Sequence, residues 1–195
     1  MGYERLPKPA LLIAPVFSAD PALIETARGA LADRWGPVAL TSDPFAFDET
    51  AYYEAEMGPG LQLTLYAFER LIDPSQLPEM KRASNRLEQE LARWRAEHSG
   101  RTLAGSTVSS RPVNIDPGYL TEAKFVLATT KDRDHRLYLR DGVFAEITLR
   151  YTHGAWRAFE WTYPNYQRAD YQAFLSRCRE YYRERLRQDS GGASE

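Results

Sequence analysis

The densest group of chemically useful side chains lies in residues 129–136, which read Thr-Thr-Lys-Asp-Arg-Asp-His-Arg. Hydroxyl and cationic groups in this pattern could hold a phosphate or a carboxylate through charge-assisted hydrogen bonds. The predicted ligand-binding residues of the segment are Thr129, Thr130, Asp132 and Arg136. His135 is the candidate general acid or base, with Asp132 to orient it and Lys131 to stabilise charge. The alternative is a solvated loop whose charges pair with one another.

A second set of candidates lies outside this segment. Residues 116–119 read Asp-Pro-Gly-Tyr, and Asp116 could be a carboxylate that acts on the ligand, with Lys124 as a further binding residue. The alternative for this tetrapeptide is a plain turn, in which proline presets φ and glycine takes the next position. Glu146 lies in an alternating apolar segment. It is either an ordinary outward residue or a ligand-binding residue that shares a polar site with Asp116 and His135.

Metal and nucleophile signatures are weak. The three histidines lack the spacing of a zinc site, and acidic side chains that bind Mg²⁺ through oxygen leave little trace in a sequence. The one cysteine, Cys178, falls on the apolar face of an expected helix, which is typical of a small core residue. We therefore predict no metal ligands, and the sequence names no cofactor.

Length and charge place further bounds on the protein. The chain has 195 residues, and 25 Lys and Arg stand against 27 Asp and Glu, so the formal net charge is −2. This balance gives no global reason to bind DNA or an anionic membrane, and no stretch approaches the ~20 apolar residues of a membrane-spanning helix. With one cysteine and no signal segment, we expect a cytoplasmic protein. We expect one domain, residues 1–187, and a disordered tail, residues 188–195.

The elements that must position these residues can be placed from breakers and periodicity. Helices are predicted to begin at Asp20-Pro21 and Asp73-Pro74, where aspartate caps the helix and proline fits its first turn, and a third follows Pro164. Apolar residues from Leu77 to Trp94 recur at helical spacing. Asp141-Gly142 is a strong hairpin turn. The expected strands cover residues 10–17, 38–41, 61–68, 112–115, 121–130, 135–139, 143–151 and 155–161.

This order of elements predicts an α+β fold. We expect a mixed sheet with helices packed on one face, ferredoxin-like β-α-β halves, a three-strand meander and a C-terminal helix. Residues 43–60 are expected to be mostly loop, and residues 99–110 a flexible loop rich in Gly, Ser and Thr.

Four segments carry a resemblance to a known family. They are residues 56–59 (Glu-Met-Gly-Pro), 114–120 (Asn-Ile-Asp-Pro-Gly-Tyr-Leu), 128–136 (Ala-Thr-Thr-Lys-Asp-Arg-Asp-His-Arg) and 161–164 (Trp-Thr-Tyr-Pro). From about residue 7 to residue 182 the chain resembles a bacterial family known as a domain of unknown function, which genome annotation sometimes labels "GTP-binding protein". The resemblance implies no reaction, substrate or catalytic residue. Residues 97–110 look like an addition to the family pattern.

The residues themselves do not support the GTP label in its usual form. Residues 100–107 read Gly-Arg-Thr-Leu-Ala-Gly-Ser-Thr, with the glycine spacing of a phosphate-binding loop but with Ser106 where lysine is required. No apolar strand leads into this segment, so a flexible linker is the better interpretation. Lys131 is followed directly by Asp132, whereas a guanine-reading segment needs one residue between them. A different mode of nucleotide binding stays open.

Two functions compete at this point. The leading hypothesis is a site for an anionic small molecule, phosphorylated or nucleotide-like, with catalysis undecided. The second is a non-catalytic module that binds a protein or RNA through exposed aromatic residues, which include residues 52–60 and the cluster at residues 161–166. Residues 161–166 could also be a packed strand end pinned by proline.

Overall fold

The computed structural model describes residues 2–47, 54–98 and 111–191. Its helices are α1 (Pro21–Trp35), α2 (Glu54–Met57), α3 (Leu77–His98) and α4 (Ala169–Gly191), with short 3₁₀ turns η2 (Pro74–Gln76) and η3 (Pro164–Gln167). Its strands are β1 (Ala10–Ser18), β2 (Val38–Thr41), β3 (Phe45–Ala46), β4 (Gln62–Ile72), β5 (Asn114–Ile115), β6 (Gly118–Leu120), β7 (Lys124–Thr129), β8 (Leu137–Arg140), β9 (Val143–Thr152) and β10 (Ala155–Ala158).

The strands form a single sheet with the order β10-β9-β7-β6-β1-β4-β2. Three short strands pair outside this order: β3 with β4, β5 with β1 and β8 with β9. The part β6-β1-β4-β2 is the ferredoxin-like unit, because α1 joins β1 to β2 and α3 joins β4 to the β5–β6 segment. Every described strand pairing is antiparallel, so these strands form an antiparallel sheet and not the mixed sheet that we expected. Each helical connection joins two strands that flank a third strand of opposite direction. The predicted α+β class is confirmed.

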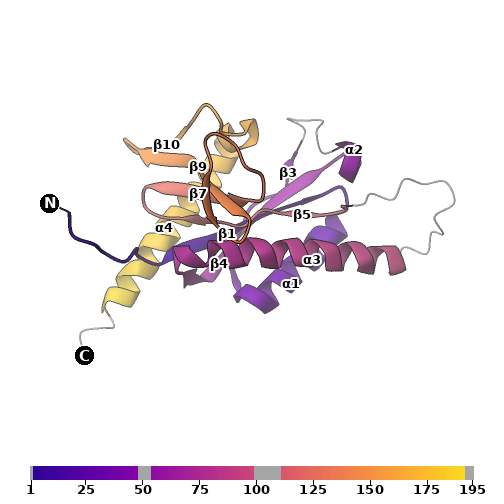
Figure 1. Ribbon diagram of the computed structural model, residues 1–195, viewed down its shortest axis with the longest axis horizontal. Coiled ribbons are helices and arrows are strands. Elements are labelled where there is room, and N and C mark those ends of the chain that lie inside the picture. The colour runs from indigo at the N-terminus through magenta and orange to yellow at the C-terminus, as the bar shows by residue number, and fades with distance from the viewer. Residues whose placement is uncertain (1, 48–53, 99–110, 192–195) are drawn as a thin grey trace.

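Helices cover both faces of the sheet, which explains why all nine residues of β1 are buried. On one face, α1 and α3 pack against Leu12 and Val16 of β1. On the other, α4 packs against Leu11 and Ile13. Figure 1 shows α1 and α3 together on one side of the sheet and α4 apart from them. We expected all helices on one face, and α4 lies on the opposite one.

Local sequence signals account for the ends of these elements. Asp20 caps α1 by accepting a hydrogen bond from the Ala22 amide, and Asp73 forms a capping box with Gln76 before α3. Asp141-Gly142 has φ of 54° and 74°, the left-handed pair that a tight hairpin between β8 and β9 requires.

Some predicted segments lie outside the described residues, and others have different bounds in the structure. The flexible loop and the glycine-spaced segment at residues 99–110 lie outside the described residues, as do Tyr52 and Tyr53 of the expected aromatic patch. α4 ends at Gly191, inside the predicted tail, and residues 192–195 are not described. Trp94 is 46% exposed, so the apolar stripe of α3 ends at Leu91. In the described chain, no helix is both long and apolar enough to cross a membrane.

Candidate functional site

A pocket lies where β7 ends and where the β5–β6 segment meets α3, and η3 closes another wall. Its charged lining residues are Lys81, Arg111, Lys131, Arg136, Asp116 and Glu146. Its rings are Phe17, Phe47, Tyr163 and Tyr166, its amides are Asn85, Asn114 and Asn165, and its hydroxyls are Thr129 and Thr130. A concave lining that combines aromatic rings with a few charged and amide groups is the usual composition of a small-molecule site.

Lys81 and Asp116 form the first charged wall. Lys81 projects from α3 and is 3% exposed, and its Nζ donates to Asp116 Oδ1 at 2.7 Å and to the Ile115 carbonyl oxygen at 3.0 Å. Asn114 Nδ2 donates to the other carboxylate oxygen at 2.6 Å. Burial acts to raise the pKa of Asp116, but the Lys81 ammonium and the Asn114 amide outweigh it and hold the pKa below its ordinary value. Asp116 is therefore ionised at neutral pH.

Glu88 of α3 connects this wall to the sheet through hydrogen bonds. Its Oε1 accepts from the Ile115 amide at 2.7 Å, and its Oε2 accepts from Arg111 Nε at 3.0 Å. Arg111 also contacts Asn114 Oδ1. Burial raises the pKa of Glu88, although Lys81 and Arg111 pull it down. The buried polar face of α3 thus fixes the position of β5 and of the residue that follows it.

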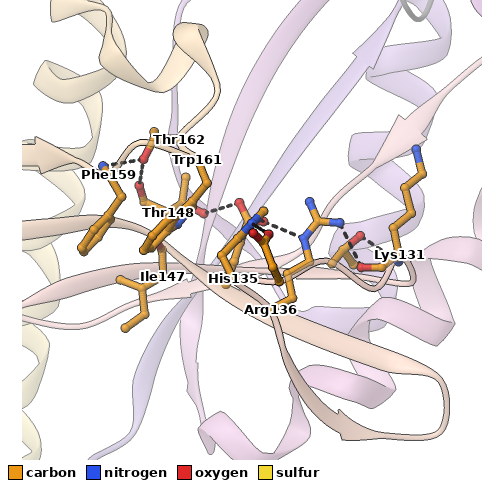
Figure 2. A network of polar contacts seen from close by, with 11 residues as sticks. Lys131, His135, Arg136, Ile147, Thr148, Phe159, Trp161 and Thr162 are labelled. Carbon is orange, nitrogen blue, oxygen red and sulfur yellow. Dashed lines mark hydrogen bonds and ion pairs between the residues drawn. The ribbon is translucent and has the colours of Figure 1, made fainter.

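Glu146 organises the opposite wall. It is 4% exposed on β9, and its Oε2 accepts from Arg136 Nε at 2.8 Å and lies 3.2 Å from His135 Nε2. Arg136 also donates from a terminal nitrogen to the Lys131 carbonyl oxygen at 2.9 Å, a contact visible in Figure 2. These bonds close residues 131–136 into a fixed loop, so Lys131 is held at the pocket.

His135 faces away from the pocket. Its ring stacks on Trp161 with centroids 5.3 Å apart and an interplanar angle of 9°. Its Nδ1 lies 3.1 Å from Asp134 Oδ1, so Asp134 rather than Asp132 is the carboxylate beside it. Together with Glu160, these residues line a separate shallow depression. His135 therefore reaches the pocket only through Glu146.

The family model described as Domain of unknown function (DUF4416) matches residues 8–182. The chain belongs to this family. No curated protein matches the chain, and no solved structure matches it. The resemblance seen in the four sequence segments is confirmed, and the DUF4416 match brings no reaction, ligand or GTP-binding function with it.

In this DUF4416 chain, six of the nine site residues predicted from sequence line one pocket: Asp116, Thr129, Thr130, Lys131, Arg136 and Glu146. The structure does not bring the other three into it. His135 lies on the far side of Glu146, and Asp132 is exposed on the loop. Lys124 lies at the other end of β7, opposite Arg150 of β9.

The polar lining residues that sequence reasoning missed include Lys81, Arg111 and Asn165. Lys81 had a signal, because it falls four residues after Leu77 on the buried stripe of α3, where a charge needs a partner. Arg111 had no such signal in the sequence, since it follows a segment rich in small polar residues. Asn165 is 3% exposed in η3, and within the described chain its side-chain amide makes no hydrogen bond. It therefore presents unused donors and an acceptor to the pocket.

Proposed function

We propose that this pocket binds an anionic small molecule that also carries a flat or apolar part, which describes a phosphorylated or nucleotide-like compound. The observation that carries the proposal is the convergence of four cationic and two acidic side chains with four aromatic rings in one lining. A small anion with an apolar part needs both kinds of group.

The anionic end of the ligand is assigned to the loop after β7. Thr129 and Thr130 offer hydroxyls there, and Lys131 offers an ammonium. Arg136 uses Nε and one terminal nitrogen within the protein, and a guanidinium has five N–H donors, so donors are left for a ligand. Because Glu146 and the Lys131 carbonyl hold this guanidinium, little conformational entropy is lost when an anion binds it.

The apolar end is assigned to the wall formed by Phe47, Tyr163 and Tyr166. Tyr163 is 44% exposed and Tyr166 is 5% exposed, so one ring can move to meet a ligand while the other is fixed in the core. Asn165 lies between them in sequence, and its buried amide can donate to and accept from the edge of a heterocycle. This combination favours a nucleotide-like ligand over a plain carboxylate.

Asp116 is assigned to a cationic or hydrogen-bond-donating group of the ligand. It lines the pocket, and Lys81 and Asn114 overcome burial to keep its pKa below the ordinary value, so it is an ionised carboxylate and a weak base. His135 acts as a positioning residue, since it touches Glu146 and not the pocket.

Thermal unfolding tests the proposal. The protein is heated with nucleotides, sugar phosphates and carboxylates in turn, with and without Mg²⁺. A compound present at 100 times its dissociation constant adds about 2.7 kcal/mol to the free energy of unfolding. For a chain of this length, we expect at least one phosphorylated compound to raise Tm by roughly 5–10 °C.

Two variants of the same loop locate the effect. Lys131→Ala removes a lining cation, and we expect the shift to fall below half, because a hydrogen bond to a charged group contributes about 1.5–3 kcal/mol. Arg133→Ala removes an exposed cation two residues further on, outside the lining, and should keep the full shift. No shift with any compound, or equal shifts in both variants, would contradict the proposal.

A further inference from the structure

Three cationic residues lie directly beside one another on β7, β9 and β10. Lys124 is the register partner of Arg150, and Arg150 is the partner of Arg157. Residues directly opposite in antiparallel strands project from the same face. Since neighbouring strands lie about 4.8 Å apart, the three side chains form a line across the sheet, here called the cationic row.

The cationic row is not neutralised by the rest of the described chain. None of its members forms an ion pair with a described carboxylate, and Arg150 and Arg157 are exposed. The neighbouring Leu149 and Trp156 are buried against α4 on the other face of the sheet. Like charges directly opposite one another destabilise a sheet. Two such pairs in succession, in a chain of net charge −2, indicate a surface adapted to an external anion.

A column of aromatic rings begins at the centre of this row. The guanidinium of Arg150 lies 5.6 Å from the centroid of the Phe159 ring. Phe159 stacks on Trp161 with centroids 4.8 Å apart and an interplanar angle of 3°, and Trp161 stacks on His135. Phe159, Trp161 and His135 can be followed in Figure 2. At the His135 end, the shallow depression exposes Trp161 beside Asp134 and Glu160.

We propose that the cationic row and this ring column bind single-stranded RNA. Successive phosphates lie on Lys124, Arg150 and Arg157, and a splayed base lies in the depression against the edge of Trp161, whose two faces are stacked on Phe159 and His135. The carboxylates of Asp134 and Glu160 accept hydrogen bonds from the amino groups of that base. A basic track beside aromatic rings is the usual design of single-strand binding surfaces.

The charge pattern favours RNA over two other anionic partners. Membrane surfaces are bound by clusters of 4–8 basic residues, more than the three of the cationic row. Duplex DNA keeps its bases inside grooves that a helix or a β-ribbon must enter, whereas single-stranded RNA presents unstacked bases to a surface. The row is also separate from the small-molecule pocket, which none of its three residues lines.

Fluorescence anisotropy with a labelled single-stranded RNA of about 20 nucleotides tests this proposal. Neutralising three phosphates on a single strand gives a salt slope near −2, so affinity should fall about 20-fold between about 50 and 200 mM salt. The variant with Lys124→Gln, Arg150→Gln and Arg157→Gln should lose at least about 10-fold in affinity at the lower salt concentration.

The matched control changes the same residue types elsewhere. Lys8→Gln, Arg70→Gln and Arg86→Gln remove one lysine and two arginines that are exposed and form no ion pair with a described carboxylate. This variant should bind RNA like the wild type. Because the row variant loses like-charge repulsion, its Tm should equal or exceed that of the wild type, which separates lost binding from misfolding. Equal RNA affinity of the two variants, equally tight binding of duplex DNA, or binding of anionic vesicles alone would overturn the proposal.

Discussion

Lys81→Met will lower the free energy of unfolding by about 3 kcal/mol, which corresponds to a fall in Tm of roughly 6–12 °C. Methionine fills the space of the lysine side chain but removes the ammonium that Asp116 and the Ile115 carbonyl oxygen share. The remaining carboxylate is then held by Asn114 without its main cation. Breaking a buried ion pair on one side costs more than the pair contributes, because a charge is left without compensation. Chemical and thermal unfolding measure the loss.

The adjacent residue supplies the control for this variant. Arg82→Met also breaks an ion pair, but Arg82 and its partner Asp141 are each about half exposed and 3.3 Å apart, so the loss should stay below about 1 kcal/mol.

The effect of Lys81→Met should depend on pH. In the wild type, burial raises the pKa of Asp116, but Lys81 outweighs it and keeps the pKa low. The carboxylate therefore stabilises the fold above its unfolded pKa, and this stabilisation is lost as the pH falls through the lowered pKa. The difference in free energy of unfolding between the wild type and Lys81→Met should accordingly become smaller as the pH is lowered. Equal losses of unfolding free energy in Lys81→Met and Arg82→Met would show that Lys81 stabilises the fold by packing alone and that its charge contributes nothing.

Gly118→Ala is the second change with a large expected effect. A Cβ at this position would lie 2.3 Å from the Val126 carbonyl oxygen and 2.9 Å from Leu127 Cδ2. The first of these atoms belongs to the backbone of β7, so β6 and β7 must move apart to make room. We expect a loss of about 3 kcal/mol or more, and a Tm lower by roughly 6–12 °C.

This pairing also joins the two charged walls of the pocket. Asp116 precedes β6, Thr129 ends β7, and the Ala128 amide donates to the Pro117 carbonyl oxygen at 3.0 Å. Gly118→Ala should therefore weaken ligand binding as well as the fold. Gly29→Ala in α1 is the matched control: its Cβ would have no atom within 4 Å, and alanine should stabilise the helix by roughly 0.5–1 kcal/mol. A Gly118→Ala protein as stable as the wild type would contradict the close packing of β6 on β7.

Local signals predicted much of the fold because they act within a few residues. Asp20-Pro21 and Asp73-Pro74 fix the starts of α1 and of the turn before α3, and Asp141-Gly142 fixes a hairpin, whatever lies elsewhere in the chain. The loop after β7 was recognisable as a candidate site, since a strand ends there in a run of polar residues.

What the sequence could not show depends on contacts between distant residues. Lys81 meets Asp116 across 35 positions because α3 crosses the sheet beside β5. His135 had the reactivity expected of a catalytic residue, but Glu146 and the Trp161 ring hold it outside the pocket. Gly118 resembled a turn glycine, yet it lies in β6 without a positive φ, and close approach of β7 is the reason for glycine there. Register and crossing geometry decide each of these cases.

The most direct test of the ligand pocket follows the side-chain amide of Asn165 by NMR. The compound with the largest thermal shift is titrated into ¹⁵N-labelled protein, and the Asn165 side-chain signals are identified by their absence in Asn165→Ser. Our account predicts that these signals and the backbone amides of Thr130 and Lys131 shift together and saturate with one dissociation constant, while the amide of Lys124 at the far end of β7 stays in place. If the Asn165 and Lys131 signals stay in place while the compound binds and moves other signals, the ligand lies elsewhere and the assignment of this pocket is wrong.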